Sequence, residues 1–183
     1  MTMYDWDGTT TRELGKVYDW DGTTSHQLGK GYDWDGTTNN LIYSAELVLL
    51  NGTENQNAWT LEAGSKTDEG LSVHYQSNSG TLNKAWKCST TWSAGEFSSM
   101  VVNAFYVYGA AESYFKVRFY NSSDTLIQTI ELWSSSAGVS DIQSQAFQRT
   151  VNVPSTAVKC DFVFYCGQYY SGSGYKLYSA ILQ

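Results

Sequence analysis

The sequence predicts an all-β protein in which a short β-repeat shaft precedes an antiparallel jelly-roll β-sandwich. Two observations favour this fold class. A repeat with a 14-residue period opens the chain, and short segments of alternating polarity, separated by Gly, Asn and Ser, fill the rest. The period is lost after residue 43, so we expect a repeat region at 1–43 and the sandwich at 44–183. A chain of 183 residues suffices for one such domain with an appendage.

The repeat region contains the heptapeptide Tyr-Asp-Trp-Asp-Gly-Thr-Thr three times, beginning at Tyr4, Tyr18 and Tyr32. Asp-Gly is a turn signal, and the flanking aromatic and threonine residues favour β-structure, so each copy predicts strand, turn and strand. One copy offers about three large apolar side chains, too few to fold alone. We therefore expect self-association through a shaft, as a homo-oligomer and most simply a homotrimer.

The second region contains nine segments with strand character and no helical periodicity. Alternation is clearest in 113–120, where Phe115, Val117 and Phe119 oppose Tyr114, Lys116, Arg118 and Tyr120, which indicates one buried and one wet face. The spacing of the segments is typical of an antiparallel sandwich or jelly roll. The expected strands are 45–50, 58–63, 71–76, 98–108, 113–120, 126–132, 147–153, 158–166 and 176–182.

The composition argues against nucleic-acid and membrane partners. Lys and Arg number 11 against 18 Asp and Glu, and the formal net charge of -7 is unsuited to neutralising phosphates. No apolar run approaches the roughly 18 residues of a membrane span, and the N-terminus has no basic and apolar secretory signal. The three cysteines, Cys88, Cys160 and Cys166, show no metal-type spacing, and we expect buried thiols.

Several segments of the second region resemble carbohydrate-binding modules with the galactose-binding-like jelly-roll fold. They are Glu-Leu-Val-Leu-Leu-Asn-Gly at 46–52, Ala-Trp-Thr-Leu-Glu-Ala-Gly at 58–64, the central Tyr-Phe-Lys-Val-Arg-Phe-Tyr-Asn at 114–121, and Phe-Gln-Arg-Thr-Val-Asn-Val-Pro at 147–154. The resemblance implies a non-catalytic domain that binds a glycan. Modules of this family often carry calcium held by an acidic residue in the last strand, and 175–180 of this chain has none.

The 14-residue repeats resemble arrays in tail-fibre or minor tail proteins of bacteriophages, where they precede a C-terminal tip domain. This resemblance implies a component of the virion tail that acts outside the host cell. We therefore expect the non-catalytic receptor-binding tip of a phage tail fibre, which binds a cell-surface glycan of the host. The alternatives are a purely structural fibre module and a module of a polysaccharide-degrading enzyme.

Sugar recognition favours aromatic platforms flanked by amides, because a sugar has an apolar C–H face and a rim of hydroxyls. Aromatics are 15% of the chain, and the Gly/Ser-rich segment 167–175 concentrates them in a loop, where binding residues are common. The same rings could instead pack under loops or form subunit contacts. The expected carbohydrate-binding residues are Trp86, Trp92, Gln168, Tyr169, Tyr170 and Tyr175.

The Asp-Trp-Asp-Gly sequence of each repeat invites a calcium site, since hard cations prefer carboxylate ligands. No Glu follows at the twelfth position of such a loop, so Asp-Gly as a turn former is the simpler interpretation. No cofactor is therefore expected, with calcium as the open alternative. The weak candidate ligands are Asp5, Asp7, Asp19, Asp21, Asp33 and Asp35.

The sequence contains no recognisable catalytic motif. Its two histidines, His26 and His74, stand in unlike contexts, and neither His-Glu-x-x-His nor Gly-x-Ser-x-Gly occurs. A pair of carboxylates brought together by the fold stays an alternative, because their separation is set in space. We expect the protein not to be an enzyme.

Overall fold

The structure is a computed structural model that describes residues 3–6, 11–14, 18–20, 25–27, 30–34, 39–44, 46–74, 81–107, 112–135, 144–166 and 174–183. Before residue 46 it describes strand pairing alone. The chain divides into two compact units, Met1–Leu47 together with Gln183, and Val48–Leu182. The domain boundary expected between residues 43 and 44 stays a prediction, because compactness alone does not define an independent folding unit.

The N-terminal unit contains three antiparallel strand pairs, each a separate two-stranded sheet. They are β1 (Met3–Trp6) with β2 (Thr11–Leu14), β3 (Tyr18–Trp20) with β4 (Ser25–Gln27), and β5 (Lys30–Trp34) with β6 (Asn39–Ser44). Each repeat therefore supplies two strands, as the sequence predicts. The Asp-Gly turns between them lie outside the described residues.

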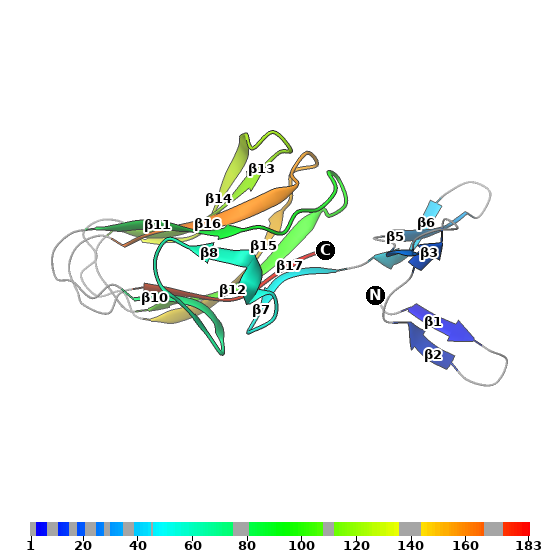
Figure 1. Ribbon diagram of the computed structural model, residues 1–183, viewed down its shortest axis with the longest axis horizontal. Coiled ribbons are helices and arrows are strands. Elements are labelled where there is room, and N and C mark those ends of the chain that lie inside the picture. Colours follow the sequence, from blue (N-terminus) through cyan, green and yellow to red (C-terminus); the bar gives the residue numbers. More distant parts are fainter. Residues whose placement is uncertain are drawn as a thin grey trace. The chain divides into compact units, whose positions relative to one another are not determined.

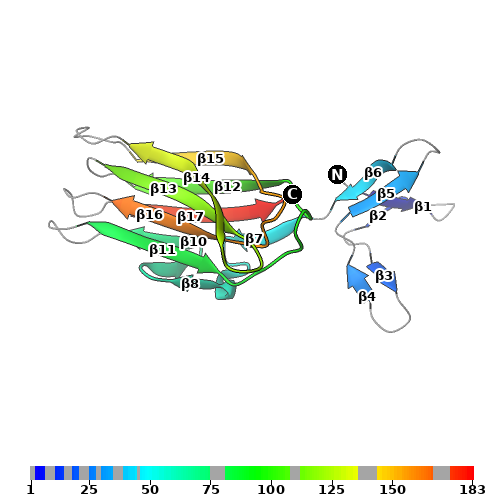
Figure 2. The same cartoon turned by 90° about the horizontal axis from the view of Figure 1, so that it is seen from above.

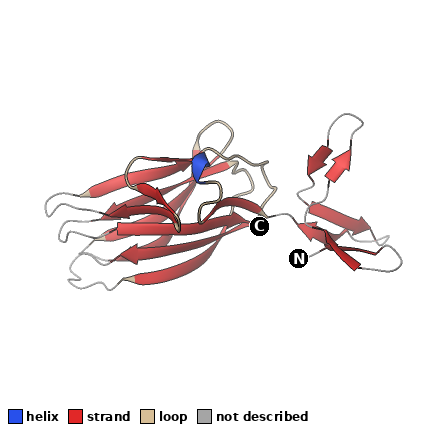
Figure 3. Cartoon of the chain, turned by 60° about the horizontal axis from the view of Figure 1, so that its bottom comes forward, coloured by secondary structure: helices blue, strands red, loops and turns tan. Residues whose placement is uncertain are grey.

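The second unit is a sandwich of two antiparallel sheets, seen as two layers in Figure 1. The first sheet contains β7 (Leu47–Asn51), β9 (Ser65–Thr67), β10 (Gly70–His74), β12 (Ser99–Val107), β15 (Gln145–Asn152) and β17 (Gly174–Leu182). The second contains β8 (Trp59–Leu61), β11 (Leu82–Cys88), β13 (Ser113–Tyr120), β14 (Leu126–Ser135) and β16 (Lys159–Cys166). A short 3-10 helix, Gln56–Ala58, precedes β8 (Figure 3).

The strand order is that of a jelly roll. The first sheet runs β15-β12-β17-β10-β9 and the second β14-β13-β16-β11-β8, so successive strands cross between the sheets except at the β9–β10 and β13–β14 hairpins. Figure 2 shows these strands side by side along the sandwich. The predicted fold class is therefore confirmed.

The core between the sheets is built largely of aromatic rings. Phe115 lies at its centre, stacked on Phe162 with ring centroids 5.4 Å apart and on Tyr175 with centroids 5.2 Å apart. Trp86 contacts Phe115 edge to face, and Trp59, expected in the core, is 3% exposed. The thiols of Cys88, Cys160 and Cys166 are free and buried, as predicted.

All nine predicted strands are present with boundaries shifted by a few residues, and two were missed. β9 is short, and β11 lacks a clean alternation because Ala85 and Trp86 are both buried although they face opposite sides. His74, at the end of β10, is exposed. Within the described ranges, no helix reaches the length and hydropathy that a membrane span requires.

Candidate functional site

The candidate site is the outer face of the second sheet, the surface turned away from the core. Antiparallel pairing of β16 with β13 and β11 sets their outward side chains in rows across the sheet. The rows are Tyr114, Tyr165 and Asn83; Lys116, Val163 and Ala85; Arg118, Asp161 and Lys87; and Tyr120 with Lys159. The outer face therefore has tyrosine rings at one end and charged groups at the other.

The tyrosine end is a stacked pair on neighbouring strands. The rings of Tyr114 and Tyr165 are 5.3 Å apart between centroids at an interplanar angle of 18°. The Lys116 ammonium lies 4.3 Å from the Tyr114 centroid, so Tyr114 is flanked by a cation and a ring. Because β16 lies between β13 and β11, the side of Tyr165 away from Tyr114 is toward β11, where the exposed Asn83 is its cross-strand partner.

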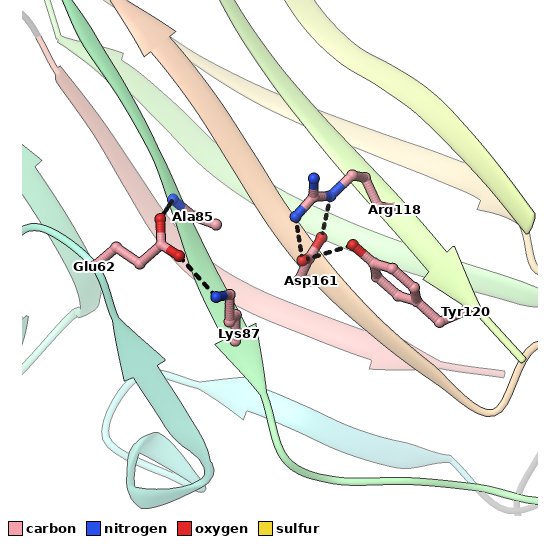
Figure 4. A network of polar contacts seen from close by, with 6 residues as sticks. All are labelled: Glu62, Ala85, Lys87, Arg118, Tyr120 and Asp161. Carbon is pink, nitrogen blue, oxygen red and sulfur yellow. Dashed lines mark hydrogen bonds and ion pairs between the residues drawn. The ribbon is translucent and has the colours of Figure 1, made fainter. Parts of the chain in front are cut away.

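The charged end is centred on Asp161, the acidic residue buried on this face (Figure 4). Arg118 donates from Nε and Nη2 to its two carboxylate oxygens at 2.7 and 2.5 Å, and the Tyr120 hydroxyl donates to Oδ2 at 2.9 Å. The hydrogen bond to Asp161 raises the pKa of Arg118. Burial first, and then the charge of Asp161, raise the pKa of Tyr120 to about 12. Arg118 and Tyr120 therefore both keep their protons near neutral pH.

A second ion pair lies beside this network, between Glu62, the residue that follows β8, and Lys87 of β11. Glu62 accepts a hydrogen bond from the Ala85 N–H at 3.0 Å, and its other oxygen lies 2.7 Å from Lys87 Nζ (Figure 4). The bond from Lys87 holds the pKa of Glu62 below its ordinary value. Glu62 is therefore an ionised hydrogen-bond acceptor at neutral pH.

A hollow of about 360 Å³ lies at this end, lined by residues of β11, β13 and β16 together with Asp124. Lys159 pairs with Asp124 and lies 5.8 Å from the ring centroid of Tyr120. The thiols of Cys88 and Cys160 also line the hollow, and burial raises the pKa of both, that of Cys160 strongly. These thiols stay protonated and are poor nucleophiles.

Three of the residues predicted to bind sugar are buried, and for them the prediction is wrong. Trp86 and Tyr175 are fully buried, and Trp92 is 7% exposed. Trp86 donates from Nε1 to the Ala63 carbonyl at 2.9 Å, and Tyr175 donates to the Tyr165 carbonyl at 3.3 Å. Trp86 on β11 and Tyr175 on β17 point between the sheets, and Trp92 is buried in the segment that joins β11 to β12.

The other predicted residues stay untested. Gln168, Tyr169 and Tyr170 lie outside the described residues, as do Asp7, Asp21 and Asp35. Asp5, Asp19 and Asp33 lie on described strands, but their side chains are not described. Within the described part of the chain, no three His, Cys, Asp or Glu residues gather as metal ligands.

Sequence reasoning placed Tyr114, Lys116, Arg118 and Tyr120 on a wet strand face but did not assign them to a site. Alternation in 158–166 also places Asp161 and Tyr165 opposite the buried Phe162 and Phe164. That signal was available. Only the strand register shows which of these residues lie opposite one another on neighbouring strands.

No family model and no curated protein sequence matches the chain. Among solved structures, it is similar to the enzymatically active domain of tailspike protein 4 of bacteriophage CBA120, with 12% identity over 73% of this chain and 20% of that chain and a TM-score of 0.48. It is also similar to the K3 cleaved adhesin domain of Lys-gingipain from Porphyromonas gingivalis w83, with 13% identity over 76% of this chain and 99% of that chain and a TM-score of 0.49.

A variant of a family 29 carbohydrate-binding module matches with 10% identity over 76% of this chain and 92% of that chain, at a TM-score of 0.44. Similarities of this size assign the chain neither to a family nor to a function.

Proposed function

We propose that the sandwich is a non-catalytic carbohydrate-binding domain that takes a glycan on the outer face. The observation that carries the proposal is the juxtaposition of a half-buried tyrosine ring, Tyr165, with amide and charged groups across neighbouring strands. A ring face suits the apolar C–H face of a sugar, and a few placed polar groups fix its hydroxyls.

The two ends of the outer face suit a short oligosaccharide. The Tyr165 row and the Asp161 row are four residues apart along β16, or about 13 Å at 3.3 Å per residue. The half-buried Val163 lies between them, paired with the buried Ala85, and offers a small apolar surface. Arg118 uses Nε and Nη2 for Asp161, and the remaining nitrogen points away from the carboxylate (Figure 4).

The carboxylates of this face are poorly suited to glycoside hydrolysis. A general acid needs a raised pKa, whereas the pKa of Glu62 is lowered by Lys87. Asp161 is held by the guanidinium of Arg118. These pairings support binding rather than catalysis, and release of reducing ends from a bound polysaccharide would contradict this part of the proposal.

The test is glycan binding by the intact chain, on an array of bacterial surface glycans and then by calorimetry. Tyr165→Ala should weaken binding about tenfold, equivalent to about 1.4 kcal/mol. Tyr178→Ala is the matched control, because Tyr178 is another half-buried tyrosine but lies on β17 of the other sheet. Equal affinities for both variants, with the fold intact, would contradict the proposed site.

We further propose that the repeats form an oligomeric shaft and that the sandwich is the tip of a phage tail fibre. The support is that each repeat is a two-stranded pair without a third strand among the described residues, and isolated hairpins are marginal in water. Association in threes would also raise avidity for a repeated glycan. Light scattering should show a trimer for the intact chain, and a monomer for both it and residues 44–183 would contradict the shaft.

A further inference from the structure

A larger hollow lies at an edge of the sandwich, away from the hollow of the outer face. β14 is the terminal strand of the second sheet and β15 that of the first, and Figure 2 shows them along the same side. Between them is a groove of about 680 Å³, lined only by residues of these two strands. Neither strand has a further partner among the described residues, so the groove stands open where the two sheets end.

Two rigid and nearly buried rings lie behind the groove. Trp133 and Phe147 line it and are 8% and 9% exposed. Trp133 stacks on Tyr106 with centroids 4.1 Å apart at 20°, and Phe147 contacts Phe115 edge to face at 6.3 Å. These contacts fix both rings from behind, and the polar side chains of the lining would supply most of the contact with a ligand.

The rim carries an arginine that has no ion-pair partner among the described residues. Arg149 is exposed, its Cζ lies 5.9 Å from the ring centroid of Phe147, and Nη1 donates to the Gln148 carbonyl at 3.0 Å. The other arginine of the sandwich, Arg118, is engaged with Asp161, whereas Arg149 forms no ion pair among the described residues. A guanidinium held over a ring with free N–H groups is suited to a planar carboxylate, which it binds through two parallel hydrogen bonds.

The one carboxylate in the lining is already compensated. Glu131 accepts from Ser134 Oγ at 2.5 Å, and its other oxygen lies 3.5 Å from Lys116 Nζ. Its repulsion of an anionic ligand is therefore reduced. Gln145 also lines the groove and offers amide groups to sugar hydroxyls.

We infer that this groove is a second carbohydrate site and that it binds an acidic sugar, with the sugar carboxylate paired to Arg149. The inference rests on the proposed function in taking the ligand to be a glycan, but it uses none of the residues that form the tyrosine pair. A chain that binds through both surfaces would contact two separate parts of one host polysaccharide.

The test uses two acidic probes with matched neutral ones: tri-galacturonic acid against its methyl ester, and sialyllactose against lactose. The intact chain should bind at least one acidic probe more tightly than its neutral partner. Arg149→Gln should weaken that binding roughly tenfold or more, as expected for loss of a charge-assisted pair. Lys66→Gln, which removes one positive charge from exposed β9, is the control and should leave the affinity unchanged.

Two results would overturn the inference: neither acidic probe binds better than its neutral partner, or Arg149→Gln binds as tightly as the unaltered protein. The proposed function is tested separately by Tyr165→Ala. If neutral glycans bind through Tyr165 while binding of acidic probes is insensitive to Arg149→Gln, the proposed site on the outer face would be supported and the proposed site in the groove would be contradicted.

Discussion

Replacing Arg118 by Met tests whether the charged network supports the sheet. Met keeps much of the aliphatic stem but removes both bonds to Asp161, whose side chain is only 7% exposed against 29% for Arg118. Removing one partner of a buried pair costs about 3–5 kcal/mol. The partial exposure of Arg118 and the remaining bond from Tyr120 reduce this, so we expect a loss of about 2–3 kcal/mol.

The assay is urea unfolding of the intact chain followed by near-UV circular dichroism, which reports the aromatic core. Because the penalty comes from an unpaired buried carboxylate, Asp161→Asn in the Arg118→Met background should recover about 1 kcal/mol or more. Lys176→Met is the control, since its partner Glu69 is 64% exposed and such a pair contributes about 0–1 kcal/mol.

A loss below about 0.5 kcal/mol for Arg118→Met would refute the reasoning, because that is the range of exposed ion pairs. A double variant no more stable than Arg118→Met would refute it as well. In either case the network of Arg118, Tyr120 and Asp161 would contribute little to folding stability, and its role would be confined to ligand binding.

Two further predictions concern the core and alkaline pH. Phe115→Ala should cost about 3–5 kcal/mol in the same unfolding assay, because it removes the ring on which Phe162 and Tyr175 stack; a loss under about 1 kcal/mol would contradict this. Tyr120 ionises near pH 10 when unfolded but has a pKa of about 12 in the fold, so the unfolded chain loses a proton that the folded chain keeps, and stability falls as pH rises between these values. Tyr120→Phe should make this fall shallower, and an unchanged slope of the urea midpoint against pH would contradict it.

The fold class could be predicted from the sequence because the alternation of polar and apolar residues along a strand is a local signal. Phe115, Val117 and Phe119 are fully buried as their alternation predicts. β11 was missed since the outward-facing Ala85 is buried as well, which breaks the period of two. The strand order that makes the jelly roll depends on pairings between distant segments, which a local pattern does not encode.

The site was harder to predict because the choice between core and surface depends on contacts that are distant in sequence. Tyr175 borders a Gly/Ser-rich segment and was assigned to a loop site, yet its strand turns it inward against Phe115. Conversely, Arg118 and Asp161 are 43 residues apart in sequence, and only the register of β13 and β16 makes them partners. The wet face of 113–120 was predictable, but its partners were not.

The aromatic core also bears on how the outer face would bind. The outward residues Tyr165 and Asp161 alternate along β16 with the fully buried Phe164 and Phe162, which pack against Trp86 and Trp59. A strand anchored at every second residue holds the intervening side chains in place before a ligand arrives. Binding would then cost little conformational entropy in these side chains. The effect of Tyr165→Ala should therefore come from lost contact with the sugar and not from disorder of the outer face. The variant should accordingly weaken binding while leaving the urea midpoint nearly unchanged.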